Sequence, residues 1–221
     1  MLTSYLIRVL LPDEPGSLGK LAGSMGLAQG NIQSVDIVEQ FPDGTVMDDI
    51  VVTLPGEYLP DTLVSAAQAD ENMVIDSIRP FSGRVDRRGQ VKILANLVKA
   101  GAKGASLETL AAGISQTMTA GWCVILKTKP QVTRAAATPS APEDEGSTPT
   151  SINVTEARML YPDNEDWIPE TWGLLDSSLI ATPLYGTDYV LVIGRPGGPE
   201  FISSEIEHLD DLGVIIGAIL D

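Results

Sequence analysis

Apolar and polar positions in the first eighty residues alternate in a way that predicts strands and helices in turn. A short apolar run at residues 5–11 closes at a Pro-Asp-Glu-Pro-Gly segment, which is typical of a buried strand that enters a turn. A helix is predicted next, because apolar residues recur at spacings of three and four before Gly30, a residue that can end it. Those apolar positions are Leu18, Leu21, Ala22 and Met25.

Residues 31–54 predict a β-hairpin, since two segments rich in Val and Ile flank a Phe-Pro-Asp-Gly turn at 41–44. A second helix over 60–69 and a strand over 73–78 follow, and the apolar side of that helix is formed by Leu59, Leu63, Ala66 and Ala67. The predicted order is strand, helix, strand, strand, helix, strand. An antiparallel sheet of this kind carries its helices on one face, which makes this part an α+β domain.

The first strand offers no side that is polar along its length. One side holds Leu6, Arg8 and Leu10, and the other holds Tyr5, Ile7, Val9 and Leu11. We therefore expect the open face of the sheet, or one of its edges, to be covered by a second copy or by the rest of the chain.

The chain after residue 81 follows a different pattern. A polar stretch predicts a linker over 82–90, which separates a domain over 1–81 from a second one over 91–221. In the second domain, residues 130–150 are rich in Ala, Pro, Ser and Thr and are expected to form a disordered insertion. The other elements predicted there are helices over 91–100, 106–118 and 201–220 and strands over 122–126, 155–160, 177–184 and 188–194.

The net charge of the chain argues against several classes of function. With 14 Lys and Arg against 30 Asp and Glu, the net charge of −16 disfavours binding to nucleic acid or to an anionic membrane. Neither a signal-peptide pattern at the start nor a long apolar stretch is evident, so a cytoplasmic protein is expected. Half of the basic side chains lie between Arg79 and Lys103, a stretch that is either a solvated connector or a docking surface for an acidic neighbour.

Candidate catalytic and metal-binding residues are scarce. Cys123 is the only cysteine and His208 the only histidine, so neither a disulfide, a metal site nor a catalytic triad is expected. The pairs Asp48-Asp49 and Asp210-Asp211 are interpreted as surface charge, because adjacent side chains diverge. Gly194 to Pro199 is interpreted as a tight turn, and Trp122 as a core residue. We expect no enzyme activity and no cofactor.

Residues 13–18 and 30–32 hold the candidate binding site. Asp13 is a candidate N-cap, and Gly16 lets a ligand approach the main chain at a helix start, where unpaired N–H groups suit a carboxylate. Asp13 and the amide oxygen of Asn31 would accept hydrogen bonds from an ammonium group. A purely structural N-cap and turn is the alternative interpretation. The candidate ligand-binding residues are Asp13, Glu14, Gly16, Ser17, Leu18, Gly30, Asn31 and Ile32.

Residues 4–80 resemble an ACT domain, the small regulatory module of amino-acid metabolic enzymes. The likeness rests on Leu-Pro-Asp-Glu-Pro-Gly-Ser-Leu at 11–18, Gly-Asn-Ile at 30–32 and Val-Asp-Ile-Val-Glu at 35–39. It implies a ferredoxin-like βαββαβ fold, side-by-side pairing of the sheets of two chains, and an amino acid bound at the pairing interface through Asp13, Gly16 and Asn31.

The second domain is similar to GAF domains at its C-terminal end. Residues 189–195, the turn at 196–201 and the helix at 204–220 resemble the closing strand, turn and helix of that family. The likeness implies an antiparallel sheet flanked by helices, in a domain that senses a small molecule or mediates dimerisation.

Two functions follow from these expectations. The first is a non-catalytic homodimeric sensor, which binds a small amino acid or related metabolite at its N-terminal domain and transmits the signal to the GAF-like domain. The alternative is a ligand-free dimerisation module that docks on a metabolic enzyme or regulator. Two departures from the ACT pattern favour the alternative: Leu11 stands where some members have a polar residue, and Asn31 follows Gly30 directly.

Overall fold

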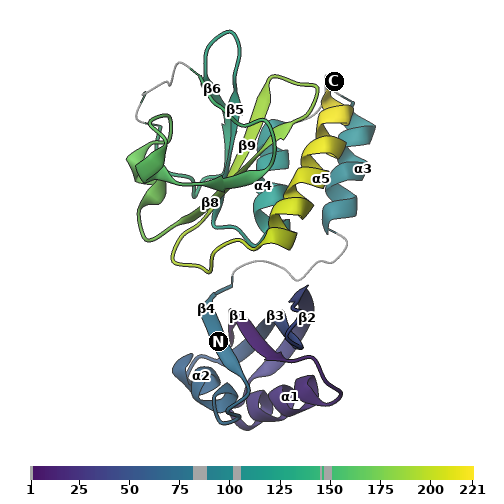
Figure 1. Ribbon diagram of the computed structural model, residues 1–221, viewed down its shortest axis with the longest axis vertical. Coiled ribbons are helices and arrows are strands. Elements are labelled where there is room, and N and C mark those ends of the chain that lie inside the picture. The colour runs from purple at the N-terminus through teal and green to yellow at the C-terminus, as the bar shows by residue number, and fades with distance from the viewer. Residues whose placement is uncertain (1, 82–88, 102–105, 145, 147–150) are drawn as a thin grey trace. The chain divides into compact units, whose positions relative to one another are not determined.

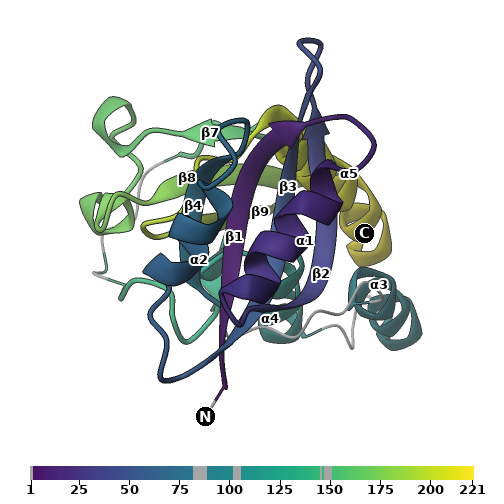
Figure 2. The ribbon, with the colours of Figure 1, turned by 90° about the horizontal axis from the view of Figure 1, so that it is seen from below.

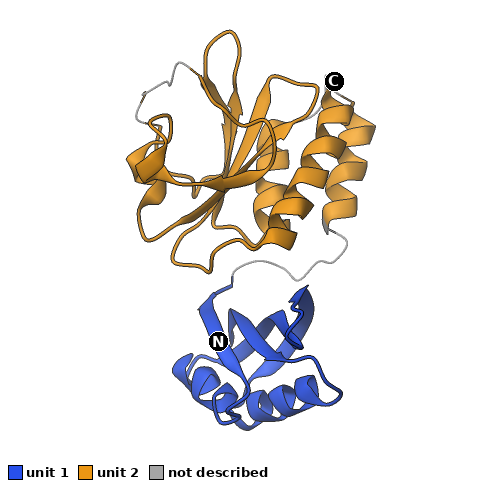
Figure 3. Ribbon diagram, viewed as in Figure 1, with its two compact units in different colours: residues 1–85 blue, residues 86–221 orange. Residues whose placement is uncertain are grey.

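The computed structural model describes residues 2–81, 89–101, 106–144, 146 and 151–221. The chain divides into two compact units, 1–85 and 86–221 (Figure 3). The division falls among the residues predicted to be a linker, of which 82–88 lie outside the described residues. Each unit has its own core.

The first unit is a four-stranded antiparallel sheet with two helices on one face (Figure 2). Its strand order is β2-β3-β1-β4, so β2 and β4 are the edges. The predicted succession of strands and helices over residues 5–78 is observed. Its elements are β1 (Leu2–Pro12), α1 (Ser17–Leu27), β2 (Asn31–Gln40), β3 (Thr45–Pro55), α2 (Asp61–Ala67) and β4 (Val74–Pro80).

One face of β1 supplies the core of the first unit. Ile7, Val9 and Leu11 pack under Leu21 of α1 and Leu63 of α2. The predicted apolar side of the first helix is too wide, since Leu18 and Ala22 are exposed and only Ser17, Leu21 and Met25 are buried. These three residues are spaced by four, so α1 contacts the sheet along a single narrow line.

The opposite face of β1 carries a buried cation. The guanidinium of Arg8 donates from Nε to Asp49 Oδ1 at 2.8 Å and from Nη2 to Asp49 Oδ2 at 2.9 Å. Arg8 and Asp49 are cross-strand partners on β1 and β3, which places the two side chains on the same face. The interpretation of Asp49 as surface charge is therefore wrong.

The second unit has a five-stranded antiparallel sheet of order β6-β5-β9-β8-β7, with helices on one face (Figure 1). Helix α3 begins at Gly89, slightly before the predicted start. The helices are α3 (Gly89–Ala100), α4 (Leu107–Thr117) and α5 (Ser203–Leu220), with short 3₁₀ helices η1 (Pro162–Asn164) and η2 (Glu170–Gly173). The strands are β5 (Trp122–Lys127), β6 (Thr133–Ala137), β7 (Arg158–Leu160), β8 (Ser178–Leu184) and β9 (Tyr189–Arg195).

Both faces of this sheet are covered. Helices α4 and α5 pack on one face, around Leu110, Ile193 and Leu212, and α3 packs on these two helices. The other face lies under the segment that contains η1 and η2, around Trp122 and Trp172. This sheet is buried on both sides, which explains the continuous apolar runs in β5 and β9.

The predicted disorder of residues 130–150 is wrong for most of that segment. Residues 133–137 form β6, an edge strand paired with β5, and Val132 and Ala136 are buried. Thr138 extends the contact, because the backbone N–H of Cys123 donates to its hydroxyl at 3.0 Å. Main-chain pairing and small side chains hold this strand, so its sequence lacks the apolar alternation on which the prediction depended. Residues 145 and 147–150 lie outside the described part of the chain.

Candidate functional site

The helix start that was expected to bind a carboxylate is capped by Gly16. Gly16 has a φ of 101°, a left-handed conformation that favours glycine, and no described side chain caps α1. The predicted N-cap Asp13 is wrong, because its carboxylate accepts instead from Gln40 Nε2 at 3.1 Å. Its backbone N–H donates to Gly44 at 2.9 Å. Asp13 and Glu14 are exposed, Ser17 is buried and Leu18 faces solvent.

Gly30, Asn31 and Ile32 lie at the start of β2, where the chain leaves α1. Asn31 is exposed and pairs with Thr53 of β3, whose hydroxyl donates to the Asn31 carbonyl at 3.2 Å. Gly30 is tightly enclosed, because an added β-carbon would lie 2.8 Å from Leu63 and 2.9 Å from Val52. Gly30 thus has a packing role that the sequence did not reveal.

Within one chain these two groups of residues do not meet. Asn31 begins β2, whereas Asp13 contacts Gln40 at the end of this strand, nine residues later. At about 3.3 Å per residue this separation is about 30 Å. The expected crevice, in which Asp13 and Asn31 of the same chain hold one small ligand, is therefore wrong as a single-chain site.

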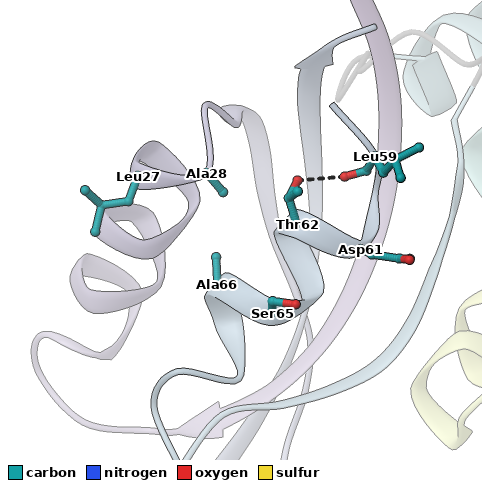
Figure 4. Close-up of a pocket in the computed structure, with 7 residues that line it drawn as sticks. All are labelled: Leu27, Ala28, Leu59, Asp61, Thr62, Ser65 and Ala66. Atoms are coloured by element: carbon teal, nitrogen blue, oxygen red, sulfur yellow. Dashed lines mark hydrogen bonds between the residues drawn. The ribbon is translucent and has the colours of Figure 1, made fainter. Parts of the chain in front are cut away.

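A hollow of about 530 Å³ lies between the two helices of the first unit (Figure 4). Ala28 and Ala66 point toward each other across it, and Thr62 donates its hydroxyl proton to the Leu59 carbonyl at 2.6 Å. Leu59 was predicted to be on the packed side of the helix but is 70% exposed. The hollow is open and mostly apolar, and its full lining is Leu27, Ala28, Leu59, Asp61, Thr62, Ser65 and Ala66.

Asp48 is the most unusual polar residue of the first unit. Only 1% of it is exposed, and neither carboxylate oxygen has a hydrogen-bond partner among the described residues. Burial raises the pKa of this carboxyl, and the negative charges of Asp49 and Asp13 raise it further. The prediction that Asp48 is a surface charge is wrong.

Three tryptophans gather on one face of the second sheet. The rings of Trp122 and Trp172 lie 5.5 Å apart edge to face, and those of Trp167 and Trp172 lie 6.4 Å apart. Trp122 is a core residue, as predicted. Trp172 Nε1 and Thr171 Oγ1 are buried without a hydrogen-bond partner in the described structure. Trp172 in η2 and the nearby Trp167 lie far from Trp122 of β5 in the chain, so only the fold brings the three rings together.

Other candidate residues have structural surroundings. Asp210 was interpreted as surface charge, but it accepts from the Ala157 N–H at 3.0 Å and from the Tyr185 hydroxyl at 2.7 Å. His208 contacts Gln90. Burial raises the pKa of the Cys123 thiol, which keeps it protonated. Among the residues described, no three side chains of the metal-binding types come together.

Comparison with known proteins gives no family. No family model matches the chain, and no curated protein matches it. No described helix has both the length and the apolar character needed to span a bilayer.

Solved structures give distant similarities only. The GAF domain of an Acinetobacter phosphoenolpyruvate-protein phosphotransferase is 15% identical, with a TM-score of 0.43, over 59% of this chain and 92% of that one. The corresponding domain from Coxiella burnetii is 14% identical, with the same TM-score, over 60% and 92%. The chromophore-binding domain of a Stigmatella aurantiaca bacteriophytochrome is 10% identical, with a TM-score of 0.36, over 98% and 93%. These similarities assign neither a family nor a function.

Proposed function

We propose that this protein is a non-catalytic sensor, in which two ACT-type first units pair along β2 and bind a small amino acid at each end of the paired strands. The single observation that supports this proposal is the position of β2. It is an edge strand, it begins at Asn31, and it ends beside Asp13.

A twofold axis through the middle of β2 would unite the separated residues. Two copies of an edge strand that pair antiparallel place the first residue of one opposite the last residue of the other. Asn31 of one copy then lies beside Gln40 of the second copy, and therefore beside its Asp13. The separation of about 30 Å within one chain becomes proximity between two chains, and the dimer has two equivalent sites.

Each group has a chemical role in such a site. The start of α1 after Gly16, where no described side chain caps the helix, presents N–H donors and the positive end of the helix dipole to a carboxylate. The carboxylate of Asp13 and the amide oxygen of Asn31 accept hydrogen bonds from the ammonium group. Together these groups match a zwitterion, and the exposed side chains of Asp13 and Asn31 are accessible to one.

The second unit, as a GAF-like domain, would receive the signal. Its antiparallel sheet and flanking helices agree with that role. Binding changes the second unit only if the ligand favours one relative arrangement of units or chains over another. In this proposal the protein is cytoplasmic, and it acts on a metabolic enzyme or regulator without a cofactor of its own.

The experiment exploits the sharing of each site between two chains. The full chain is screened against the free amino acids by thermal shift and calorimetry, and at least one should stabilise it. Asp13→Ala and Asn31→Ala should each abolish binding. When the two variants are mixed, the heterodimer contains one intact site, formed by Asp13 of one chain and Asn31 of the other. Mixing should therefore restore binding, with half the sites of the wild-type dimer intact in each heterodimer.

Glu57→Ala, which changes an exposed acid in the loop after β3, is the control and should bind normally. An amino acid that still binds both variants would contradict the proposed site. If no amino acid binds the wild-type chain, the sensor proposal fails.

A ligand-free assembly module is the second candidate function. The two departures from the ACT pattern, Leu11 and the direct succession of Gly30 and Asn31, favour it. In that case no amino acid shifts the unfolding temperature, and a partner protein is retained equally by the wild-type chain and by Asn31→Ala.

A further inference from the structure

Helices α3 and α5 of the second unit expose a group of branched aliphatic side chains. On α3 these are Val91, 68% exposed, and Val98, 62% exposed; on α5 they are Val214 and Ile215, 48% and 44% exposed. We propose that this α3–α5 face is an interface with a second copy of the chain, in which α3 of each copy packs against α5 of the other. The proposal is independent of amino-acid binding by the first unit.

The exposed residues belong to one surface. The two helices lie side by side in both views of the unit (Figures 1 and 2), and Gln90 of α3 contacts His208 of α5. Ile215 lies seven residues after His208, so it is on the side of α5 that adjoins α3. Val91 and Val98 are also seven residues apart and form one stripe on α3.

The charges on the two helices identify a second copy as the occupant. The sequence of α3 contains Lys92 and Lys99 and no acidic residue, whereas α5 contains four acidic residues and neither Lys nor Arg. Two of those acids are engaged, Glu205 with Arg195 and Asp210 with Tyr185. The other two, Glu207 and Asp211, are exposed, as are both lysines.

None of these four exposed charges forms an ion pair with a described residue of its own chain. A surface that is basic on one helix and acidic on the next is complementary to itself under a twofold rotation. The rotation that brings α3 against α5 of the second copy places lysines opposite carboxylates in both symmetric contacts.

Helix length is compatible with this arrangement. With 12 and 18 residues, α3 and α5 are about 18 and 27 Å long. Two such pairs form a four-helix arrangement, with the exposed valines and Ile215 at its centre and the charges at its rim.

Charge reversal in two separate chains tests the proposal. One full-length variant carries Lys92→Glu and Lys99→Glu, and the other carries Glu207→Lys and Asp211→Lys. In either variant alone both contacts become repulsive, so its dimer dissociation constant should rise about tenfold. In the mixture each contact joins opposite charges again. Native mass spectrometry should then find heterodimers in excess of the statistical one half.

This readout separates the interface from pairing along β2. Dimers held only by the first unit would contain the two variants in statistical proportion. The proposal is overturned if each variant associates as tightly as the wild-type chain and the mixture forms heterodimers only in that proportion. The proposal is also overturned if each variant associates more weakly and the mixture does not recover association, because the substituted charges then act within each chain. A failure of amino-acid binding has no bearing on these outcomes.

An apolar variant gives a second measurement. Val98→Glu places a carboxylate at the centre of the interface and should raise the dissociation constant at least tenfold. The control is Val74→Glu on β4, because Val74 is 55% exposed and lies outside the proposed surface. Equal effects of the two substitutions on association would contradict the proposal.

Discussion

Asp48 and Asp49 are adjacent on β3, and because strand neighbours point to opposite faces of a sheet, they have different surroundings. Asp48 lies on the same face as Val46 and Ile50, under the helices, and has no partner in the described structure. Asp49 lies on the other face, and its carboxylate accepts hydrogen bonds from Nε and Nη2 of Arg8. The buried carboxylate of Asp48 therefore destabilises the fold, whereas the ion-paired carboxylate of Asp49, one residue later, stabilises it.

Removing the charge of Asp48 should stabilise the first unit. Its carboxyl has a pKa raised above the ordinary 3.8, so wild-type stability falls as pH rises from that value through the folded-state pKa. In Asp48→Asn the side chain does not ionise, so its stability does not fall in this way as pH rises. At about pH 7 its free energy of unfolding should be about 1 kcal/mol higher than that of the wild-type chain, and the difference should shrink well below pH 3.8.

This effect is measured by urea unfolding, monitored through hydrogen exchange of the backbone amides of β1 and β3. Asp76→Asn, an exposed aspartate on β4, is the matched control and should change stability little at any pH. A destabilised Asp48→Asn at neutral pH would show that the carboxylate has a partner in solution.

Asp49→Asn should have the opposite effect. This substitution removes the carboxylate that both Nε and Nη2 of Arg8 contact. The Arg8 side chain is only 1% exposed, so its charge stays buried. Breaking one side of a buried ion pair costs about 3 kcal/mol, so the same urea experiment should find a lower midpoint. An effect as small as that of Asp76→Asn would mean that water replaces the carboxylate without loss.

At the scale of elements, close packing fixes the contact between β5 and β9. Gly194 on β9 is paired with Trp122 on β5, and the indole lies against the glycine. A β-carbon at residue 194 would lie 2.2 Å from two ring atoms of Trp122. This glycine is required by the neighbouring ring rather than by a turn.

Gly194→Ala should therefore displace Trp122 and destabilise the second unit by about 1 to 3 kcal/mol. All three tryptophans are in this unit, so fluorescence reports its unfolding alone. Gly23→Ala on α1, where an added β-carbon meets nothing within 4 Å, should leave the fluorescence transition unchanged. An unchanged transition in Gly194→Ala would indicate that the sheet yields without cost.

At the scale of the whole molecule, the sensor proposal requires communication between the two units. An amino acid that binds the first unit should change the tryptophan emission of the second, since the first unit contains no tryptophan. The change should saturate with the binding isotherm and disappear in Asp13→Ala. Binding without any change in emission or in hydrogen exchange of the second unit would leave a binding domain that does not signal.

The sequence by itself determined the elements of both units wherever local patterns were strong. The hairpin over 31–54, with its Pro-Asp-Gly turn, and the amphipathic closing helix formed where they were predicted, because turn chemistry and apolar periodicity act over a few residues. Strand β6 was missed because neighbouring backbone, rather than its own apolar pattern, holds it.

Only the tertiary structure decided the surroundings of the functional candidates. The chemistry of Asp13 and Asn31 was evident from their residue types, but the direction of β2 placed them at opposite ends of a strand. The orphaned carboxylate of Asp48 and the gathering of three tryptophans also depend on which distant strands become neighbours. Local sequence specifies a residue's chemistry and its element, whereas burial and partners arise from contacts between segments that the chain brings together only on folding.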